Sequence, residues 1–391
     1  MLPAAFRAGR DERLERLLPA ELLPLFDDRF IGSCVLFEEY VGRLAVRIAG
    51  ELGLEPAARE PGTAAEIAAR AGLDPAAAPV PVEWLLATLA ARGIAAREVG
   101  GRYRVAAIPA DPDLREILDA QQKHDPSSLA SYRMADLAAG HYPAVLHGEV
   151  SGEEALFAPD RIGAWFEYFS NDNPIYAISN RLGALAAERA LPSGGEILEL
   201  GGGLGSGAEA ILERFAQTGR AGGIRAYRFT EIAPSFLRRG QRRLSARFAA
   251  VPLAFSRLDM DRPFAEAGLP AEPFALVTGI NTLHVARDLE FTLGEIRSVL
   301  KPGGSLVLSE CIRPFADRPV GIEFLFNLLG VFRAPRLVAP WRPRGGFLAP
   351  ENWTAALHAC GFRDARVYPD IARIRDVCPA FVVAAITAVR A

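Results

Sequence analysis

Lysine is nearly absent from this chain of 391 residues: of its 44 basic residues, only Lys123 and Lys301 are lysines. We attribute the arginine bias to genomic composition rather than to function. Against 47 acidic residues the formal net charge is −3, so the chain carries no excess of positive charge. A general electrostatic attraction to nucleic acid or to an anionic membrane surface is therefore not expected.

Cysteine and histidine are also scarce. The four cysteines are scattered without a Cys-x-x-Cys pair, and the five histidines show no metal-ligand spacing. These patterns argue against a disulfide framework and against a protein-built metal site, and they fit a reducing, cytoplasmic environment. We therefore expect a cytoplasmic protein without a metal.

Long hydrophobic runs are missing too. Residues 1–18 place Arg and Asp inside the opening turns, which is unlike a signal peptide. The longest apolar run, around 380–389, is about half a membrane span and predicts a buried strand rather than a membrane helix. Half of the residues are apolar and 23% are charged, as in globular proteins, and the length predicts two or three domains.

Helical patterns dominate the first half of the chain. Thr63 and Glu66 form a capping-box signature at the start of one helix, a second helix is predicted over 82–93, and a short hairpin over 100–105. This order of two helices and a hairpin is typical of a winged helix. We predict a helical, winged-helix-like dimerisation domain over 1–110, a helical linker and acceptor-pocket segment over 111–188, and a catalytic domain over 189–391.

A winged helix raises the question of DNA binding. A recognition helix should present Arg, Lys, Asn or Gln to base edges. The helix expected here, 82–91, has one acid, no base and several large apolar residues. We therefore favour a packing or dimerisation role and a homodimer, with a non-catalytic winged-helix regulator as the alternative from another class.

A strand–loop–helix pattern begins at residue 196. The apolar strand 196–200 runs into a glycine-rich loop, 201–207, and a helix follows. Glycines let a backbone turn tightly and approach a ligand, which then faces the helix N-terminus. Nicotinamide-binding proteins use a related loop, so an oxidoreductase is one alternative. Glu199, however, favours a cationic ligand with a free amino group over a pyrophosphate.

The run Glu199, Gly201, Gly203, Gly205 resembles motif I of the class I S-adenosylmethionine-dependent methyltransferases. The resemblance implies an α/β fold with a Rossmann-like, mostly parallel sheet and an antiparallel last strand. It also implies S-adenosylmethionine as cofactor and S-adenosylhomocysteine as product. Predicted strands over 225–230, 274–280, 305–309, 363–368 and 381–389 fit this fold, as does the turn 301–304. The residues predicted to hold the cofactor are Glu199, Gly201, Gly203, Gly205, Glu231, Asp259, Met260 and Asn281.

A general base is predicted at the same edge of the sheet. His284 follows the strand 274–280, and Glu310 ends the strand 305–309. Adjacent parallel strands would bring the two side chains together, and a carboxylate beside an imidazole fixes its tautomer and stabilises the imidazolium. We predict that His284 takes the acceptor's proton with Glu310 in support.

Two families resemble different parts of the chain. From about residue 140 onward it resembles the C-methyltransferase domains of polyketide synthases, through 147–150, 155–157, 229–236 and 281–289. Those domains use a His–Glu dyad, and His284 and Glu310 fall on the matching positions. The N-terminal part resembles the dimerisation domain of small-molecule O-methyltransferases, and residues 309–314 resemble the ending of the fifth strand in those enzymes. Their His-Asp-Trp is absent, since Val285 and Ala286 follow His284, and Glu231 replaces the Asp more usual in the synthase domains.

We therefore expect a methyltransferase acting on an acidic carbon of a small-molecule or carrier-bound acceptor that resembles a polyketide or β-ketoacyl group. An O-methyltransferase acting on a hydroxyl or carboxyl is the alternative. The arginine run 238–247 is interpreted as a solvated helix face rather than as a docking patch. The residues predicted to bind the acceptor are Trp165, Tyr168, Phe169, Asn173, Tyr176 and Phe324.

Overall fold

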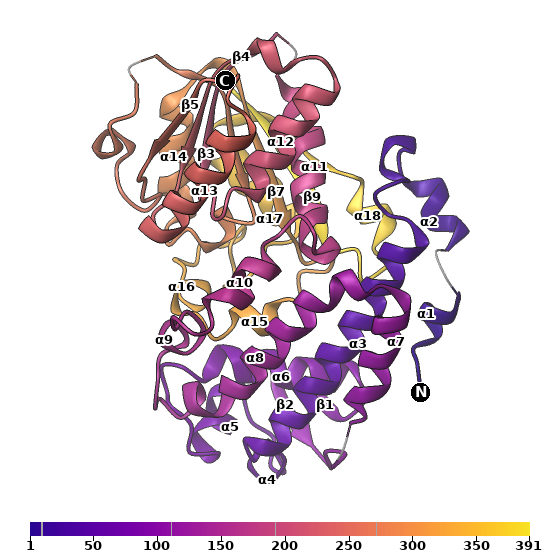
Figure 1. Cartoon of the computed structure of the whole chain (residues 1–391). Helices are drawn as coiled ribbons and strands as arrows, with labels where there is room; N and C mark the ends of the chain where they lie inside the picture. The colour runs from indigo at the N-terminus through magenta and orange to yellow at the C-terminus, as the bar shows by residue number, and fades with distance from the viewer. Residues whose placement is uncertain (9–10, 111, 192, 271) are drawn as a thin grey trace. The chain divides into compact units, whose positions relative to one another are not determined.

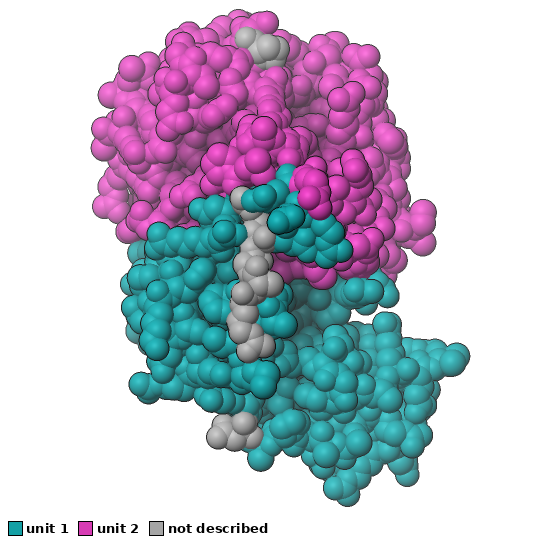
Figure 2. All heavy atoms as spheres, turned by 90° about the vertical axis from the view of Figure 1, so that its right-hand side faces the viewer, with its two compact units in different colours: residues 1–15, 26–168, 317–334 teal, residues 16–25, 169–316, 335–391 magenta. Residues whose placement is uncertain are grey.

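The computed structural model describes residues 1–8, 11–110, 112–191, 193–270 and 272–391. The chain forms two compact units, and neither is continuous in sequence (Figure 2). Unit 1 comprises residues 1–15, 26–168 and 317–334, and unit 2 comprises residues 16–25, 169–316 and 335–391.

Unit 1 is mainly helical. Its longest helix, α3 (Asp28–Glu51), is capped by the Asp27 side chain, which accepts a hydrogen bond from the Phe30 backbone N–H. The other described helices of residues 1–168 are α1 (Ala4–Ala8), α2 (Glu12–Leu17, which continues into unit 2), α4 (Leu54–Ala57), α5 (Ala64–Arg70), α6 (Pro79–Ala91), α7 (Leu114–His124), α8 (Leu129–Leu146), α9 (Gly152–Leu156) and α10 (Ile162–Tyr168) (Figure 1).

The predicted pair of helices and hairpin is present in unit 1. Thr63 and Glu66 form the expected capping box at the start of α5. The hairpin consists of β1 (Ala95–Glu98) and β2 (Arg102–Val105). Helix α6 buries most of its large apolar side chains, Trp84 among them, as its composition predicts.

A short segment far along the chain, 317–334, completes unit 1. It holds α15 (Glu323–Phe326) and α16 (Gly330–Arg333). The Trp84 indole donates to the Val320 carbonyl at 3.1 Å, and the Tyr142 hydroxyl donates to the Phe324 carbonyl at 2.7 Å. The Tyr142 and Phe324 rings also stack, with their centroids 4.5 Å apart. Helices α6 and α8 therefore hold this segment through its backbone.

Unit 2 is built on a seven-stranded sheet in the order β5-β4-β3-β6-β7-β9-β8. The first five strands of this order are parallel, and β9 is antiparallel to both of its neighbours. This is the expected α/β fold. The strands are β3 (Gly195–Leu200), β4 (Ile224–Thr230), β5 (Leu253–Ser256), β6 (Phe274–Ile280), β7 (Leu300–Cys311), β8 (Phe362–Tyr368) and β9 (Val383–Arg390).

Helices cover both faces of this sheet, with α11 and α12 on one side of the strands and α14 on the other (Figure 1). Every residue of β6 is buried, as expected of a central parallel strand. The remaining helices of unit 2 are α11 (Pro174–Ala190), α12 (Ser206–Gln217), α13 (Pro234–Arg247), α14 (Leu289–Val299), α17 (Pro350–Ala359) and α18 (Ile371–Ile374).

Two strand boundaries differ from the prediction. β7 begins at Leu300 rather than at Ser305, because Leu300 pairs with Phe274 and a register irregularity absorbs the glycine turn before Ser305 pairs with Leu276. β5 ends at Ser256, so Asp259 lies on the connection after the strand rather than at its end.

Candidate functional site

The glycine-rich loop and the base predicted from sequence lie after two neighbouring strands. β3 pairs with β6, and the chain leaves β3 toward β4 on one side and later returns to β6 on the other. Such a reversal of strand order is where open α/β sheets bind ligands. The two loops touch, because a Cβ added at Gly201 would collide with the Thr282 Oγ1 atom.

The loop after β3 needs glycine for two different reasons. Gly201, Gly203 and Gly205 all have positive φ, at 58°, 56° and 87°, which favours glycine. A Cβ at Gly205 would lie 3.3 Å from the Gly240 Cα atom, so this glycine lets α12 and α13 approach. A Cβ at Gly203 would meet no described atom within 4 Å. The space beside the Gly203 Cα atom is therefore free of described atoms.

Glu231 lies directly after β4 and is held by backbone N–H groups. Its Oε2 accepts from the Gly203 N–H and its Oε1 from the Ala233 N–H, both at 2.8 Å. Each carboxylate oxygen has two lone pairs, so one on each remains for a further donor. Two neighbouring hydroxyl groups, such as those of a ribose, match this arrangement.

Glu199 is almost fully buried on β3, where its Oε2 accepts from the Tyr227 hydroxyl at 3.0 Å. Burial raises the pKa of Glu199 to about 8, and the nearby charge of Glu231 adds to the rise. Two carboxyl groups therefore share this part of the site, and among the described residues neither forms an ion pair with a cationic side chain. A cationic ligand would restore the charged form of Glu199.

The other predicted cofactor residues lie on the connections that follow β5 and β6. Asp259 is half-buried and accepts from the Asp261 N–H through its Oδ1 atom, and the Met260 carbonyl accepts from the Thr292 hydroxyl. Asn281 adopts a φ of 49°, and its Oδ1 accepts from the Cys311 N–H at 2.7 Å. The Asn281 side chain therefore links the ends of β6 and β7.

His284 and Glu310 are in direct contact. The His284 Nδ1 and the Glu310 Oε2 lie 2.6 Å apart, and both side chains are buried, with exposures of 4% and 0%. The other oxygen of Glu310, Oε1, accepts from the Thr282 N–H at 3.1 Å and the Leu283 N–H at 2.8 Å. The carboxylate therefore orients the turn that carries the imidazole as well as the ring itself.

The aromatic and amide-rich segment before α11 is fastened to the start of α12. The Ser206 hydroxyl donates to the Phe169 carbonyl at 2.5 Å, and the Asn171 Nδ2 donates to the Ser206 carbonyl at 2.9 Å. Asn173 caps α11 and is buried, and the Phe169 and Tyr176 rings meet edge to face at 5.1 Å. Three predicted acceptor residues thus lie in the unit that carries the glycine loop.

Tyr176 faces the acidic groups of the site. Burial raises the pKa of the Tyr176 hydroxyl well above its usual value, with further contributions from the nearby Cys311 and from the three site carboxyls, Glu199, Glu310 and Glu231. A hydroxyl that stays protonated in such a place is a hydrogen-bond donor. It lies among the groups that would contact a donor and an acceptor.

Trp165, Tyr168 and Phe324 belong to unit 1, where they pack in its interior. Trp165 is fully buried, donates to the Leu156 carbonyl at 2.8 Å and meets the Tyr168 ring edge to face at 5.9 Å. The Phe324 ring lies against Tyr142 and Trp84. These contacts account for the burial of all three side chains.

Sequence reasoning missed three residues that shape the site. Tyr227 binds Glu199, and Thr282 lies against Gly201. Arg342, from a connection without regular structure, donates to the His284 carbonyl at 2.6 Å. Tyr227 is a buried residue of β4, and no sequence pattern identifies Arg342 as part of the site.

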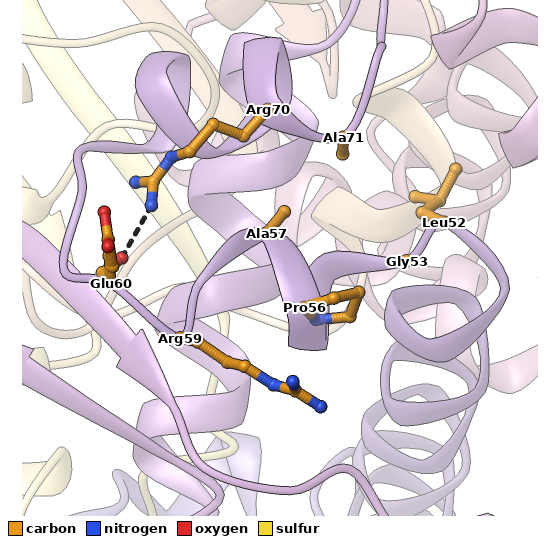
Figure 3. A pocket seen from close by; sticks show the side chains of 8 residues that line it. All are labelled: Leu52, Gly53, Pro56, Ala57, Arg59, Glu60, Arg70 and Ala71. Atoms are coloured by element: carbon orange, nitrogen blue, oxygen red, sulfur yellow. Dashed lines mark hydrogen bonds between the residues drawn. The ribbon is translucent and has the colours of Figure 1, made fainter.

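Other features of the chain lie apart from this chemistry. A hollow of about 570 Å³ in unit 1 is lined by apolar residues with Arg59, Glu60 and Arg70, and Figure 3 shows the Arg70 side chain turned toward the backbone of Glu60.

On α13, Arg243 and Arg247 pair with Glu209 of α12, so the arginine run is only partly a solvated face.

The described residues lack two kinds of feature. None of the described helices is long and apolar enough to cross a membrane. The described residues also hold no cluster of three or more His, Cys, Asp or Glu side chains that could bind a metal ion.

Comparison with known proteins agrees with this geometry. Residues 198–306 match a family model described as a methyltransferase domain. The matched stretch runs from β3 into β7, and it includes the glycine loop and His284 but ends before Glu310.

The reducing polyketide synthase Preu2 of Preussia isomera is 27% identical over 238 residues, which are 60% of this chain and 10% of that protein. The chain therefore spans about a tenth of the length of this relative. The carbon methyltransferase CurJ has a similar structure, with a TM-score of 0.76, 23% identity, and coverage of 97% of this chain and 98% of that one. The trans-methyltransferase CalH, solved with S-adenosylhomocysteine, has a TM-score of 0.61 at 19% identity, over 91% and 90% of the two chains. The predicted class I methyltransferase fold is confirmed.

Proposed function

We propose that this chain, a class I methyltransferase, moves a methyl group from S-adenosylmethionine to an acidic carbon of a β-ketoacyl or polyketide-like acceptor. The observation that carries the proposal is the buried His284–Glu310 pair, which lies beside the glycine loop at the carboxyl edge of one sheet. An activated sulfonium donor needs no Lewis acid. It needs an aligned acceptor and, for a carbon acid, a base.

The residues around the loop fit the donor by their chemistry. Glu199 would face its cationic end, Glu231 its two ribose hydroxyls, and the backbone at Gly203 would approach it closely. Asp259 and Met260 would contact the adenine, while Asn281 would keep the ends of β6 and β7 together. The donor supplies a methyl group on positively charged sulfur, which leaves as a neutral thioether.

His284 is the base of this proposal. With Nδ1–H donating to Glu310, the neutral imidazole has its lone pair on Nε2. Nε2 takes the proton from the carbon between two carbonyls, and the electron pair of that C–H bond forms the new bond to the methyl group. Glu310 stays ionised and stabilises the imidazolium. Phe169, Asn173 and Tyr176 would orient the acceptor.

Carbon rather than oxygen as the methylated atom is supported by the relatives. Preu2 is named as a polyketide synthase and CurJ as a carbon methyltransferase. We extend the activities in these names to this chain as part of the proposal, together with an acceptor that is either free or carrier-bound. The proposal also includes a homodimer formed through residues 1–110. It further includes cytoplasmic action without a metal.

The test uses methyl-¹³C-labelled donor and acetoacetyl-N-acetylcysteamine as a β-ketoacyl thioester. We expect a product whose ¹³C methyl is bonded to carbon by NMR. We expect His284→Ala to lower kcat about 10²- to 10⁴-fold while the Kd of S-adenosylmethionine, measured by calorimetry, stays within threefold. His358→Ala, an exposed histidine on α17, is the matched control. A product methylated on oxygen would move the function to the O-methyltransferases, and normal turnover by His284→Ala would remove the base.

A further inference from the structure

Arg342 is a buried arginine with few partners. Its side chain is 1% exposed, and its Nη2 atom donates to the His284 backbone carbonyl at 2.6 Å. Its backbone pairs with Val338 in both directions, which fixes the tight loop that carries the side chain. Its Nε and Nη1 atoms have no hydrogen-bond partner among the described residues.

Stability does not explain why an arginine is placed here. Burial lowers the pKa of Arg342 to about 10, so the group still carries its charge at neutral pH. A buried ion that lacks hydrogen bonds destabilises a fold, and an apolar side chain of similar volume is often as stable or more so. The few buried polar groups that lack partners in native proteins therefore call for a functional explanation.

The neighbours of Arg342 point to the base. Glu310 is the acid with the largest electrostatic effect on Arg342, followed by Asp261 and Asp288. The turn Leu283–Val285 is held at the imidazole by Glu310 and at the main chain by Arg342, and the Phe347 ring lies 4.6 Å from the imidazole.

We propose that Arg342 is a positioning residue that fixes the His284 turn and acts on the His284–Glu310 pair through its charge. This inference rests on the proposed function, because it assigns Arg342 to the dyad that serves as base. The cation favours the ionised form of Glu310, which then accepts from Nδ1–H and leaves the lone pair on Nε2. The same cation repels an imidazolium, so it lowers the proton affinity of His284.

Other charged and titratable groups around the His284–Glu310 pair also affect its protonation. Glu310 faces both His284 and Arg342, and the Tyr176 hydroxyl lies near Glu310. Asp261 and Asp288 face Arg342 and offset part of its charge. Replacing Arg342 with a neutral residue leaves these acids without their cation, so the proton affinity of His284 must rise.

The primary experiment is an NMR titration that needs no acceptor. ¹⁵N-histidine-labelled full-length protein is titrated as wild type, Arg342→Gln and Arg342→Lys, and the His284 signals are assigned from their loss in His284→Ala. We expect the His284 pKa in Arg342→Gln to be higher than in wild type by half a unit or more, and Arg342→Lys to keep the wild-type pKa within 0.3 unit. Arg225→Gln, which replaces an exposed arginine on β4, is the control and should leave the His284 pKa unchanged.

Turnover supplies the second measurement. With acetoacetyl-N-acetylcysteamine, we expect Arg342→Gln to lower kcat about 10- to 100-fold, to move the acidic limb of its pH profile upward, and to keep the Kd of S-adenosylmethionine within threefold. An unchanged His284 titration and pH profile in Arg342→Gln would overturn the inference. So would failure of the charge-conserving Arg342→Lys to fold, since that result would make the role structural.

The two proposals fail separately. If His284→Ala keeps its turnover, the base itself is wrong and the proposed function falls with it. If His284→Ala is inactive while Arg342→Gln behaves as wild type, only the role of Arg342 is lost.

Discussion

Glu310 uses its two oxygens unequally, and this decides what an amide would do in its place. Oε1 accepts from two backbone N–H groups, and Oε2 accepts from the imidazole. A glutamine must keep its carbonyl oxygen toward the two N–H groups. Its NH₂ would then face Nδ1, so the imidazole would carry its proton on Nε2 and could not take another there.

We therefore expect Glu310→Gln to lower kcat by about 10³- to 10⁴-fold, as wrong-tautomer variants of histidine bases do. The affinity for S-adenosylmethionine should change little. Kinetics and calorimetry on the same preparation test this, and the ¹⁵N histidine spectrum reports the tautomer directly. Wild-type kcat in Glu310→Gln, with the tautomer unchanged, would contradict the assignment of Nδ1 as the donor to Glu310.

Glu231 is the residue whose loss should act on the donor alone. Removing the carboxylate would take away the proposed acceptor for two ribose hydroxyls, and hydrogen bonds to charged groups contribute about 1.5–3 kcal/mol each. We expect Glu231→Ala to weaken binding of S-adenosylmethionine at least tenfold by calorimetry. Glu266→Ala, which removes an exposed glutamate of the same unit, should bind normally. Unchanged affinity in Glu231→Ala would refute the assignment of the cofactor site.

At the scale of elements, the glycine loop allows the effect of backbone strain to be measured separately from the effect of contact with a ligand. Gly203 and Gly219 both have positive φ, 56° and 71°, and a Cβ at either would meet no described atom within 4 Å. An alanine should therefore cost both positions a similar 1 kcal/mol or so of stability. Only the methyl group at position 203 would intrude on a bound donor.

We expect Gly203→Ala and Gly219→Ala to lower the melting temperature of the free protein by similar amounts. Only Gly203→Ala should weaken S-adenosylmethionine binding, by tenfold or more. Thermal unfolding and calorimetry measure the two effects. Equal affinities in the two variants would mean that the loop does not contact the donor.

The residues that follow the parallel strands were predictable as site residues, because the carboxyl ends of parallel strands lie at one edge of the sheet. Glu231 and His284 follow strands whose apolar runs are plain in the sequence, so the topology brings them to the glycine loop. Arg342 and the segment 317–334 were not predictable. Arg342 binds the backbone carbonyl of His284, and the segment 317–334 is bound through its own carbonyls at Val320 and Phe324. Every residue type has a backbone carbonyl, so no sequence pattern indicates these contacts.

For the whole molecule, each unit contains a carboxyl group with a raised pKa. Burial raises the pKa of Glu38 in unit 1 to about 7 and that of Glu199 in unit 2 to about 8. These two groups therefore bind more protons in the folded chain than in the unfolded chain from about pH 4.5 up to their own raised pKa values. The stabilisation is complete below that pH and is lost as the pH rises through 7 and 8.

We accordingly expect the free energy of unfolding of the cofactor-free protein to fall between pH 5.5 and 8.5. Denaturant unfolding at the two pH values measures the fall. Glu38→Gln should remove about 2 kcal/mol of this fall, and Glu199→Gln should flatten the slope nearer pH 8. Glu266→Gln should leave the dependence as it is, and a stability that rises over this range would contradict the direction of both shifts.

The division of the chain between its units has a consequence for synthesis. Unit 1 receives residues 317–334 only after the strands β3 to β7 of unit 2 have been made. During translation, Trp84 and Tyr142 must wait for the carbonyls of Val320 and Phe324 with their polar atoms unmatched. The amino-terminal half therefore cannot complete its core on the ribosome before the methyltransferase sheet has largely emerged, and a fragment that stops at residue 188 leaves that core permanently unfinished.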